Sequence, residues 1–147
     1  MIESARSREI QLANRALQLR NSKLDKRHRI LAAIPIVRYA AMHSKLSALR
    51  HPGTNKRIQD LTQFRRWSTS TTSDCLCCYG IPGSGKSVLA ASVVNDLLGD
   101  NLDSPPNVLY YYCDFTEDAT LDLSFLISSL IHQILVRAPL EVFSDEL

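Results

Sequence analysis

Apolar positions recur with a helical period along most of the chain, and the pattern predicts five helical segments. Residues 3–34 repeat an apolar side chain at every seventh position, which is typical of a long amphipathic helix. Residues 37–49 and 54–67 show shorter patterns, the second with apolar residues three positions apart. Residues 87–98 and 121–135 complete the set. The first pattern ends at Pro35, the second stops before Pro52-Gly53, and Gly99 follows the segment 87–98 as a stop signal.

Two apolar runs follow a different pattern and predict strands. Residues 76–79 form a compact apolar run before a glycine-rich turn, and residues 108–115 form a second run that is rich in tyrosine. Strand, helix, strand, helix is the order of a parallel α/β sheet with right-handed crossovers. Two strands do not complete such a sheet. We therefore expect the chain to stop partway through its domain.

The glycine-rich turn between the first strand and its helix has the pattern of a phosphate-binding loop. Its four defining positions are filled by Gly80, Gly85, Lys86 and Ser87. A turn with little side-chain bulk lets several backbone N–H groups converge on phosphate oxygens, and the following helix adds its positive end. We predict that the loop binds a nucleotide. The predicted binding residues are Gly80, Ile81, Pro82, Gly83, Ser84, Gly85, Lys86, Ser87 and Val88.

Individual side chains in this pattern have expected roles in ATP or GTP chemistry. Lys86 is placed to reach the β- and γ-phosphates, and Ser87 is placed to ligate Mg²⁺. P-loop enzymes also need an acidic residue at the end of another strand. Asp114 ends the tyrosine-rich run, so Lys86 and Asp114 are the candidate catalytic residues and Asp114 is a second candidate Mg²⁺ ligand. The alternative for Asp114 is a loop or helix-capping residue.

These elements together predict the fold class and the domain boundaries. The fold class is α/β, an incomplete P-loop NTPase with three α/β/α layers and a helical segment before it. Residues 1–67 form the helical lead-in, 68–74 a polar linker rich in serine and threonine, and 75–147 the N-terminal part of the nucleotide-binding domain. Residues 139–147 contain no further predicted strand that could carry the acidic, Mg²⁺-binding residue of a P-loop NTPase.

Charge is divided unevenly between these parts. Before Trp67 the chain has 15 basic and 4 acidic residues, and from there on it has 2 basic and 11 acidic. No aromatic residue is interleaved with the basic ones before Tyr39, which disfavours nucleic acid as a partner. A protein partner or self-association through the N-terminal helices is expected instead. Arg20 and Arg27 at heptad positions weaken a regular coiled coil.

Composition indicates a cytoplasmic location. No apolar run is long enough to span a bilayer, and the N-terminus lacks the apolar centre of a signal peptide. All four cysteines fall within the predicted strands and lack the paired spacing of a zinc site. They are Cys75, Cys77, Cys78 and Cys113. We expect them to be buried thiols in a reducing compartment.

The motifs together resemble a known family, the NACHT-type domain of fungal NOD-like receptors, also described as a nephrocystin-type N-terminal domain. The resemblance covers roughly residues 34–140. It is carried by four segments in order: Arg50-His-Pro-Gly-Thr54, Phe64-Arg-Arg-Trp67, the run from Cys78 to Ala90, and Tyr110-Tyr-Tyr-Cys-Asp-Phe115. Arg57 departs from it, because relatives commonly have tryptophan there. The family places its acidic strand further downstream than Asp114.

What the resemblance implies is an ATP- or GTP-binding switch in signalling, often followed by ankyrin or WD repeats. On that interpretation Gly80, Gly83, Gly85, Lys86 and Ser87 hold phosphate and Mg²⁺, and hydrolysis is slow or absent. Two other hypotheses stay open. One is a non-catalytic interaction fragment that acts through its basic helical arm. The other is a small P-loop phosphotransferase, which is disfavoured because only Arg137 is basic beyond Lys86.

Overall fold

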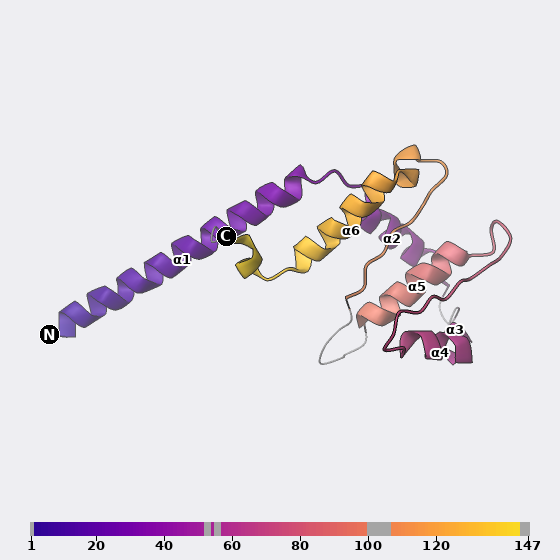
Figure 1. Cartoon of the computed structure of the whole chain (residues 1–147), viewed down its shortest axis with the longest axis horizontal. Coiled ribbons are helices and arrows are strands. Elements are labelled where there is room, and N and C mark those ends of the chain that lie inside the picture. The colour runs from indigo at the N-terminus through magenta and orange to yellow at the C-terminus, as the bar shows by residue number, and fades with distance from the viewer. Residues whose placement is uncertain (1, 52–53, 55–56, 100–106, 145–147) are drawn as a thin grey trace. The chain divides into compact units, whose positions relative to one another are not determined.

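A computed structural model describes residues 2–51, 54, 57–99 and 107–144, and these residues form helices joined by coil (Figure 1). The α-helices are α1 (Ile2–Ala33), α2 (Tyr39–Ala48), α3 (Arg57–Asp60), α4 (Thr62–Ser68), α5 (Lys86–Gly99) and α6 (Leu123–Arg137). Two short 3₁₀ helices, η1 (Asp118–Leu121) and η2 (Leu140–Phe143), lie before and after α6.

The predicted α/β class is wrong for this structure, which is all-α. The described residues contain no strand. Both predicted strands, 76–79 and 108–115, are coil in the structure, and the second ends in a turn at Phe115. An apolar run becomes a strand only when a neighbouring strand takes up its backbone hydrogen bonds in a ladder. No such ladder forms in the described part of the chain. The predicted three-layer sheet is therefore not formed.

The predicted helices, in contrast, are confirmed. The segments 3–34, 37–49 and 87–98 correspond to α1, α2 and α5, and 121–135 corresponds to the end of η1 with α6. The segment 54–67 forms two short helices rather than one, because Leu61 has an extended backbone with ψ of 131°. Helical periodicity is local, so it identifies these elements without knowledge of their partners.

The chain divides into two compact units, residues 1–37 with 113–147 and residues 38–112. In the first, α1 packs against η2 and α6. Phe143 of η2 is 2% exposed, and the guanidinium carbon of Arg27 lies 5.9 Å from the centre of its ring. Lys26 Nζ donates a hydrogen bond to the carbonyl oxygen of Ser144 at 3.1 Å. The second half of α1 is thereby fixed to the C-terminal segment.

Residues 10–19 of α1 present apolar side chains to solvent. The side chains concerned are Ile10, Leu12, Leu17 and Leu19, which are between 56% and 68% exposed. None of the helices in the described ranges combines the length and the apolar character needed to cross a bilayer.

The second unit is built around α5. Helix α2 packs against it, and Ala91 of α5 is fully buried. Phe64 of α4 is 8% exposed and packs on Trp67, with ring centres 5.6 Å apart. Since α5 starts at the end of the glycine-rich loop, the packing of α2 on α5 fixes the helix that carries the predicted phosphate-binding lysine.

Candidate nucleotide-binding site

The glycine-rich loop adopts a conformation that requires glycine at two of its positions. Gly83 and Gly85 have φ of 80° and 82°, in the left-handed region that side chains with a Cβ rarely adopt. Between them, the Ser84 N–H donates to the carbonyl of Ile81 at 3.2 Å, which closes a turn. The two glycines flank Ser84 and reverse the chain directly before α5.

Gly80 is required for a different reason, the close approach of another part of the loop. A Cβ added to Gly80 would lie 2.7 Å from Ser84 Oγ, whereas nothing lies within 4 Å of a Cβ added to Gly83 or Gly85. The loop therefore folds back on its own first residue. Sequence spacing indicated that glycine was needed here, and in the structure a Cβ at this position would require the Ser84 hydroxyl to rotate away.

Lys86 is the first residue of α5, and its side chain reaches back across the loop. Lys86 Nζ donates hydrogen bonds to the carbonyl oxygens of Gly80 and Ile81, both at 2.9 Å. The first intrahelical bond runs from the Leu89 N–H to the Gly85 carbonyl at 2.8 Å. Ser87 follows in the first turn and is exposed. The ammonium group thus sits over the loop that is predicted to hold phosphate.

A cavity of about 470 Å³ opens beside this loop. Its size is within the range of small-molecule sites. From the loop and its flanks it is lined by Cys78, Tyr79, Gly80, Ser84, Gly85, Lys86, Val88 and Leu89. The lead-in contributes three further lining residues, Leu49, His51 and Thr54. The predicted loop residues Gly80, Ser84, Gly85, Lys86 and Val88 are thereby brought to one cavity.

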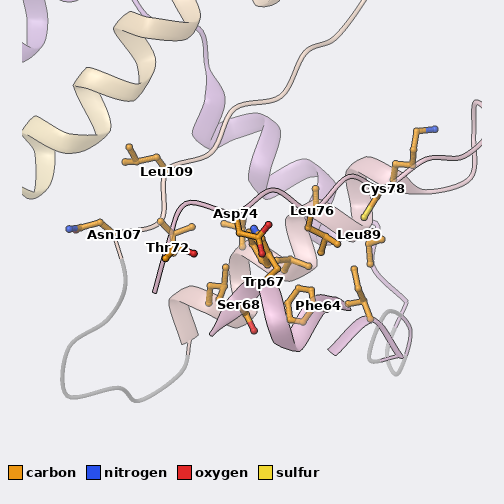
Figure 2. Close-up of a pocket in the computed structure, with 17 residues that line it drawn as sticks. Phe64, Trp67, Ser68, Thr72, Asp74, Leu76, Cys78, Leu89, Asn107 and Leu109 are labelled. Atoms are coloured by element: carbon orange, nitrogen blue, oxygen red, sulfur yellow. The ribbon is translucent and has the colours of Figure 1, made fainter. Parts of the chain in front are cut away.

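A second cavity, of about 600 Å³, lies between α4, α5 and the two coil segments (Figure 2). Its labelled lining includes Phe64, Trp67, Leu76 and Leu89, and most of the remaining residues are apolar. Lys86 contributes to this lining too, but no glycine of the loop does. The smaller cavity is the better candidate for a polyphosphate, because its lining includes Gly80, Ser84 and Gly85 of the loop as well as Lys86.

Comparison with known families finds a match that includes this loop. The family model described as Nephrocystin 3, N-terminal, matches residues 53–145, which is more than half of the chain. The chain belongs to the nephrocystin 3 N-terminal family. This family is associated with NACHT-type NTPase proteins. No curated protein and no solved structure matches the chain.

The match confirms the nephrocystin-type part of the resemblance. The region shared with the nephrocystin 3 N-terminal family contains the glycine-rich loop and helices α3 to α6, and leaves α1 and α2 outside it. The family match bears on the domain type alone, so the nucleotide and Mg²⁺ roles of the loop residues stay predictions.

Asp114, the other candidate catalytic residue, forms a local turn. Its carboxylate oxygen Oδ1 accepts hydrogen bonds from the Thr116 N–H at 2.9 Å and from the Thr116 hydroxyl at 2.6 Å. Its own N–H donates to Thr120 Oγ1 at 2.7 Å. Asp114 belongs to the unit of residues 1–37 and 113–147, whereas Lys86 and Ser87 belong to the other. Its role as a Mg²⁺ ligand stays a prediction.

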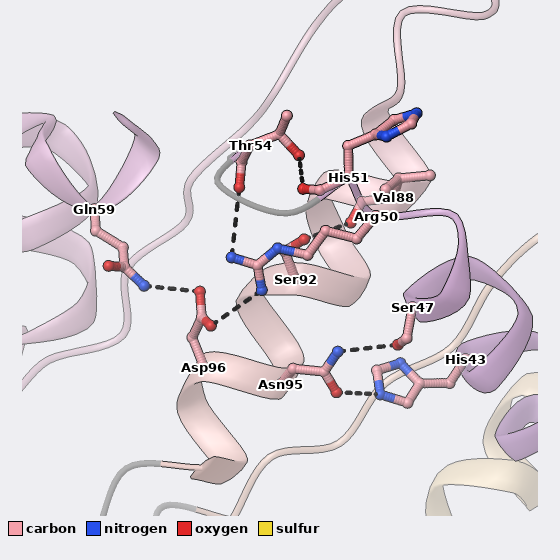
Figure 3. Close-up of polar contacts among 10 residues, drawn as sticks. All are labelled: His43, Ser47, Arg50, His51, Thr54, Gln59, Val88, Ser92, Asn95 and Asp96. Atoms are coloured by element: carbon pink, nitrogen blue, oxygen red, sulfur yellow. Dashed lines mark hydrogen bonds and ion pairs between the residues drawn. The ribbon is translucent and has the colours of Figure 1, made fainter. Parts of the chain in front are cut away.

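Sequence reasoning missed a polar network between α2 and α5, in which Asn95 is central (Figure 3). Asn95 Oδ1 lies 2.9 Å from His43 Nε2, and Asn95 Nδ2 donates to Ser47 Oγ at 2.9 Å. His43 Nδ1 lies 2.8 Å from the Tyr112 hydroxyl. His43 and Ser47 of α2 belong to no recognisable motif, so the sequence does not signal that they meet Asn95.

The prediction of buried cysteines is wrong. All four cysteines are exposed, because no sheet forms to cover the two coil segments that contain them. Cys75 and Cys77, two positions apart, place their Sγ atoms 3.6 Å from each other. The hydrogen bond with Cys77 raises the pKa of the Cys75 thiol. Their exposure could not be read from composition, since cysteine is among the most frequently buried residue types.

Proposed function

We propose that the chain is the nucleotide-binding module of a NACHT-type signalling NTPase and that it binds ATP or GTP with Mg²⁺ in the cytoplasm. The supporting observation is the loop between Gly80 and Ser87. Gly83 and Gly85 have the left-handed backbone that a tight phosphate loop requires, and Lys86 extends its ammonium over the loop. This arrangement leads directly into the N-terminus of α5, which favours anions.

The residues present suit a polyphosphate. Lys86 Nζ now bonds to two carbonyl oxygens of the loop, which are neutral acceptors. The negative oxygens of a phosphate group are stronger acceptors for an ammonium, so they would compete well for this side chain. Ser87, exposed in the first turn of α5, would supply a hydroxyl to Mg²⁺. The ion would neutralise phosphate charge, and the backbone of the loop would fix the phosphate position.

Hydrolysis is proposed to be very slow or absent. Efficient phosphoryl transfer needs an acidic residue that holds the metal ion or orients water. The carboxylate of Asp114 is already bonded to the N–H and hydroxyl of Thr116. We propose binding rather than turnover as the activity, and sustained hydrolysis that is lost in Asp114→Asn would show that Asp114 serves catalysis after all.

Substitution of Lys86 tests the proposal. In Lys86→Ala we expect Mg-ATP and Mg-GTP affinity to fall by roughly 10- to 100-fold, because a hydrogen bond to a charged group contributes about 1.5–3 kcal/mol. The measurement is isothermal titration of the purified chain. Lys45→Ala is the matched control, because Lys45 is an exposed lysine in the last turn of α2. Equal affinities of the wild type and Lys86→Ala would reject the proposal.

A second candidate function is protein association through α1. Four apolar side chains are exposed between Ile10 and Leu19, and the helix has eight basic and three acidic residues. We propose that this surface binds a protein partner or a second copy of the chain. Leu12→Glu with Leu19→Glu should reduce the sedimentation coefficient of the associated species or the recovery of a defined partner. Gln11→Glu with Gln18→Glu adds the same charge as a control. Identical behaviour of both variants would reject this role.

A further inference from the structure

The lead-in forms a closed turn beside the phosphate-binding loop. We call Arg50, His51 and Thr54 the lead-in turn. The N–H and the hydroxyl of Thr54 both donate to the carbonyl oxygen of His51, at 3.1 and 2.6 Å. Arg50 Nη2 also donates to the carbonyl oxygen of Thr54, at 3.4 Å. These bonds use the carbonyl oxygen of His51 and not its imidazole, and His51 lines the same cavity as Lys86 (Figure 3).

Asp96 of α5 is the residue that attaches this turn to the site. Its Oδ1 lies 3.5 Å from Arg50 Nη1, and its Oδ2 accepts a hydrogen bond from Gln59 Nε2 at 2.7 Å. The side chains of Arg50 and Asp96 are 25% and 29% exposed, so water screens their attraction less than it does on an open surface. One carboxylate therefore joins both the lead-in turn, through Arg50, and Gln59 after it to the helix that begins with Lys86.

The cavity beside the loop is lined by both polar and apolar groups. The loop and the start of α5 supply glycine backbone, Ser84 and the ammonium of Lys86, together with the apolar or aromatic side chains Tyr79, Val88 and Leu89. The lead-in adds an apolar side chain, Leu49, and an imidazole ring, His51. A nucleotide also combines both kinds of group, with charged phosphates at one end and a flat, partly apolar base at the other. Aromatic side chains bind bases by stacking.

We propose that Asp96 is a positioning residue for nucleotide recognition, which holds the lead-in turn in place as the part of the cavity lining that contacts the nucleoside part of the ligand. The inference rests on the proposed function, because it assigns the phosphates to the loop. It adds that the lead-in, and His51 in particular, distinguishes a nucleotide from a bare polyphosphate. Lys86 serves both ligands, whereas His51 and Asp96 serve the nucleoside alone.

Titration with two ligands tests whether His51 and Asp96 serve the nucleoside while Lys86 serves the phosphates. The probes are Mg-ATP and inorganic tripolyphosphate with Mg²⁺, measured by calorimetry on the full chain. We expect the wild type to bind ATP at least fivefold more tightly than tripolyphosphate, in line with the stacking of one base. In His51→Ala and Asp96→Asn this preference should disappear through weaker ATP binding, with tripolyphosphate affinity unchanged. Lys86→Ala should weaken both ligands.

Asp60→Asn is the matched control for Asp96→Asn. Asp60 pairs with Arg65 at 3.2 Å, and both side chains are well exposed. This substitution should leave both affinities unchanged. If Asp96→Asn fails to fold, His51→Ala still tests whether the lead-in turn contacts the nucleoside. The imidazole of His51 makes none of the hydrogen bonds that attach the turn to α5.

The outcomes distinguish a failure of this inference from a failure of the proposed function. Equal affinity of the wild type for ATP and tripolyphosphate, or a preference that survives in His51→Ala and Asp96→Asn, would overturn this inference and leave the proposed function standing. A wild-type chain that binds neither ligand would overturn the proposed function and this inference with it.

Discussion

His43 and Asn95 join α2 to α5 through a contact of 2.9 Å between Nε2 of the imidazole and Oδ1 of the amide. The amide nitrogen of Asn95 donates to Ser47, so its oxygen faces the ring and accepts the proton of Nε2. In the neutral ring, Nδ1 is then the acceptor for the Tyr112 hydroxyl at 2.8 Å. A single hydrogen-bond direction thus runs from Tyr112 through His43 to Asn95.

Loss of the Asn95 side chain should destabilise the chain. Asn95→Ala removes the hydrogen bonds to His43 and Ser47, which are half-buried. We expect the free energy of unfolding to fall by about 1–3 kcal/mol, the usual cost of leaving such groups without partners. Urea denaturation measures the change, with Asn107→Ala at an exposed coil position as the control. A loss as small as that of the control would mean that the network is not stabilising.

Tyr112 should make stability sensitive to high pH. Burial, and to a smaller extent the neighbouring Tyr110, raise the pKa of Tyr112 to about 12 from the ordinary value of 10. The folded chain therefore favours the protonated hydroxyl. Its contribution is complete below pH 10 and is lost as the pH rises toward 12.

Thermal melts between pH 9 and 12 measure this effect. Tyr112→Phe should flatten the decline in melting temperature over this range, because phenylalanine has no group to ionise. Tyr79→Phe, at a side chain that is 90% exposed, should retain the slope of the wild type. Parallel slopes for Tyr112→Phe and the wild type would show that ionisation of Tyr112 does not cause the loss of stability at high pH.

Gly80→Ala should disturb the phosphate-binding loop through Ser84, and a second substitution should restore it. The added Cβ would lie 2.7 Å from Ser84 Oγ but 3.6 Å from Ser84 Cβ, which is ordinary contact. We expect nucleotide affinity to fall in Gly80→Ala and to recover in Gly80→Ala with Ser84→Ala. Calorimetric titration provides the measurement, with Ser84→Ala alone as the reference.

Gly83→Ala supplies the contrasting case. No atom lies within 4 Å of the added Cβ, so its cost comes from the positive φ of 80°, about 1–2 kcal/mol. Ser84→Ala should therefore fail to rescue it. Rescue of both glycine variants by Ser84→Ala, or of neither, would show that the two glycines are not required for different reasons.

The four cysteines should react with a thiol reagent in the native state. All are exposed, so we expect Ellman's reagent to label four thiols per chain without denaturant. Cys75 should react more slowly than its exposure alone suggests, because its raised pKa lowers the thiolate fraction at neutral pH. Cys77→Ser should accelerate it. Native labelling of fewer than four thiols, completed only in urea, would favour buried cysteines.

Sequence patterns identified the local features of this chain. The helical period located α1, α2, α5 and α6. Asp122 caps α6, since its carboxylate accepts a hydrogen bond from the Ser124 N–H at 2.7 Å. The glycine spacing located the two left-handed residues of the loop, Gly83 and Gly85. These features depend on residues within a few positions of each other, which is why one sequence suffices to predict them.

Only the tertiary structure decided which distant residues meet. The predicted strands at 76–79 and 108–115 depend on partners for their backbone groups, and without a ladder their cysteines are exposed. His43 and Asn95, and likewise Arg50 and Asp96, lie more than 40 positions apart and carry no shared motif. Such contacts depend on how helices pack, and packing is a property of surfaces that no local pattern specifies.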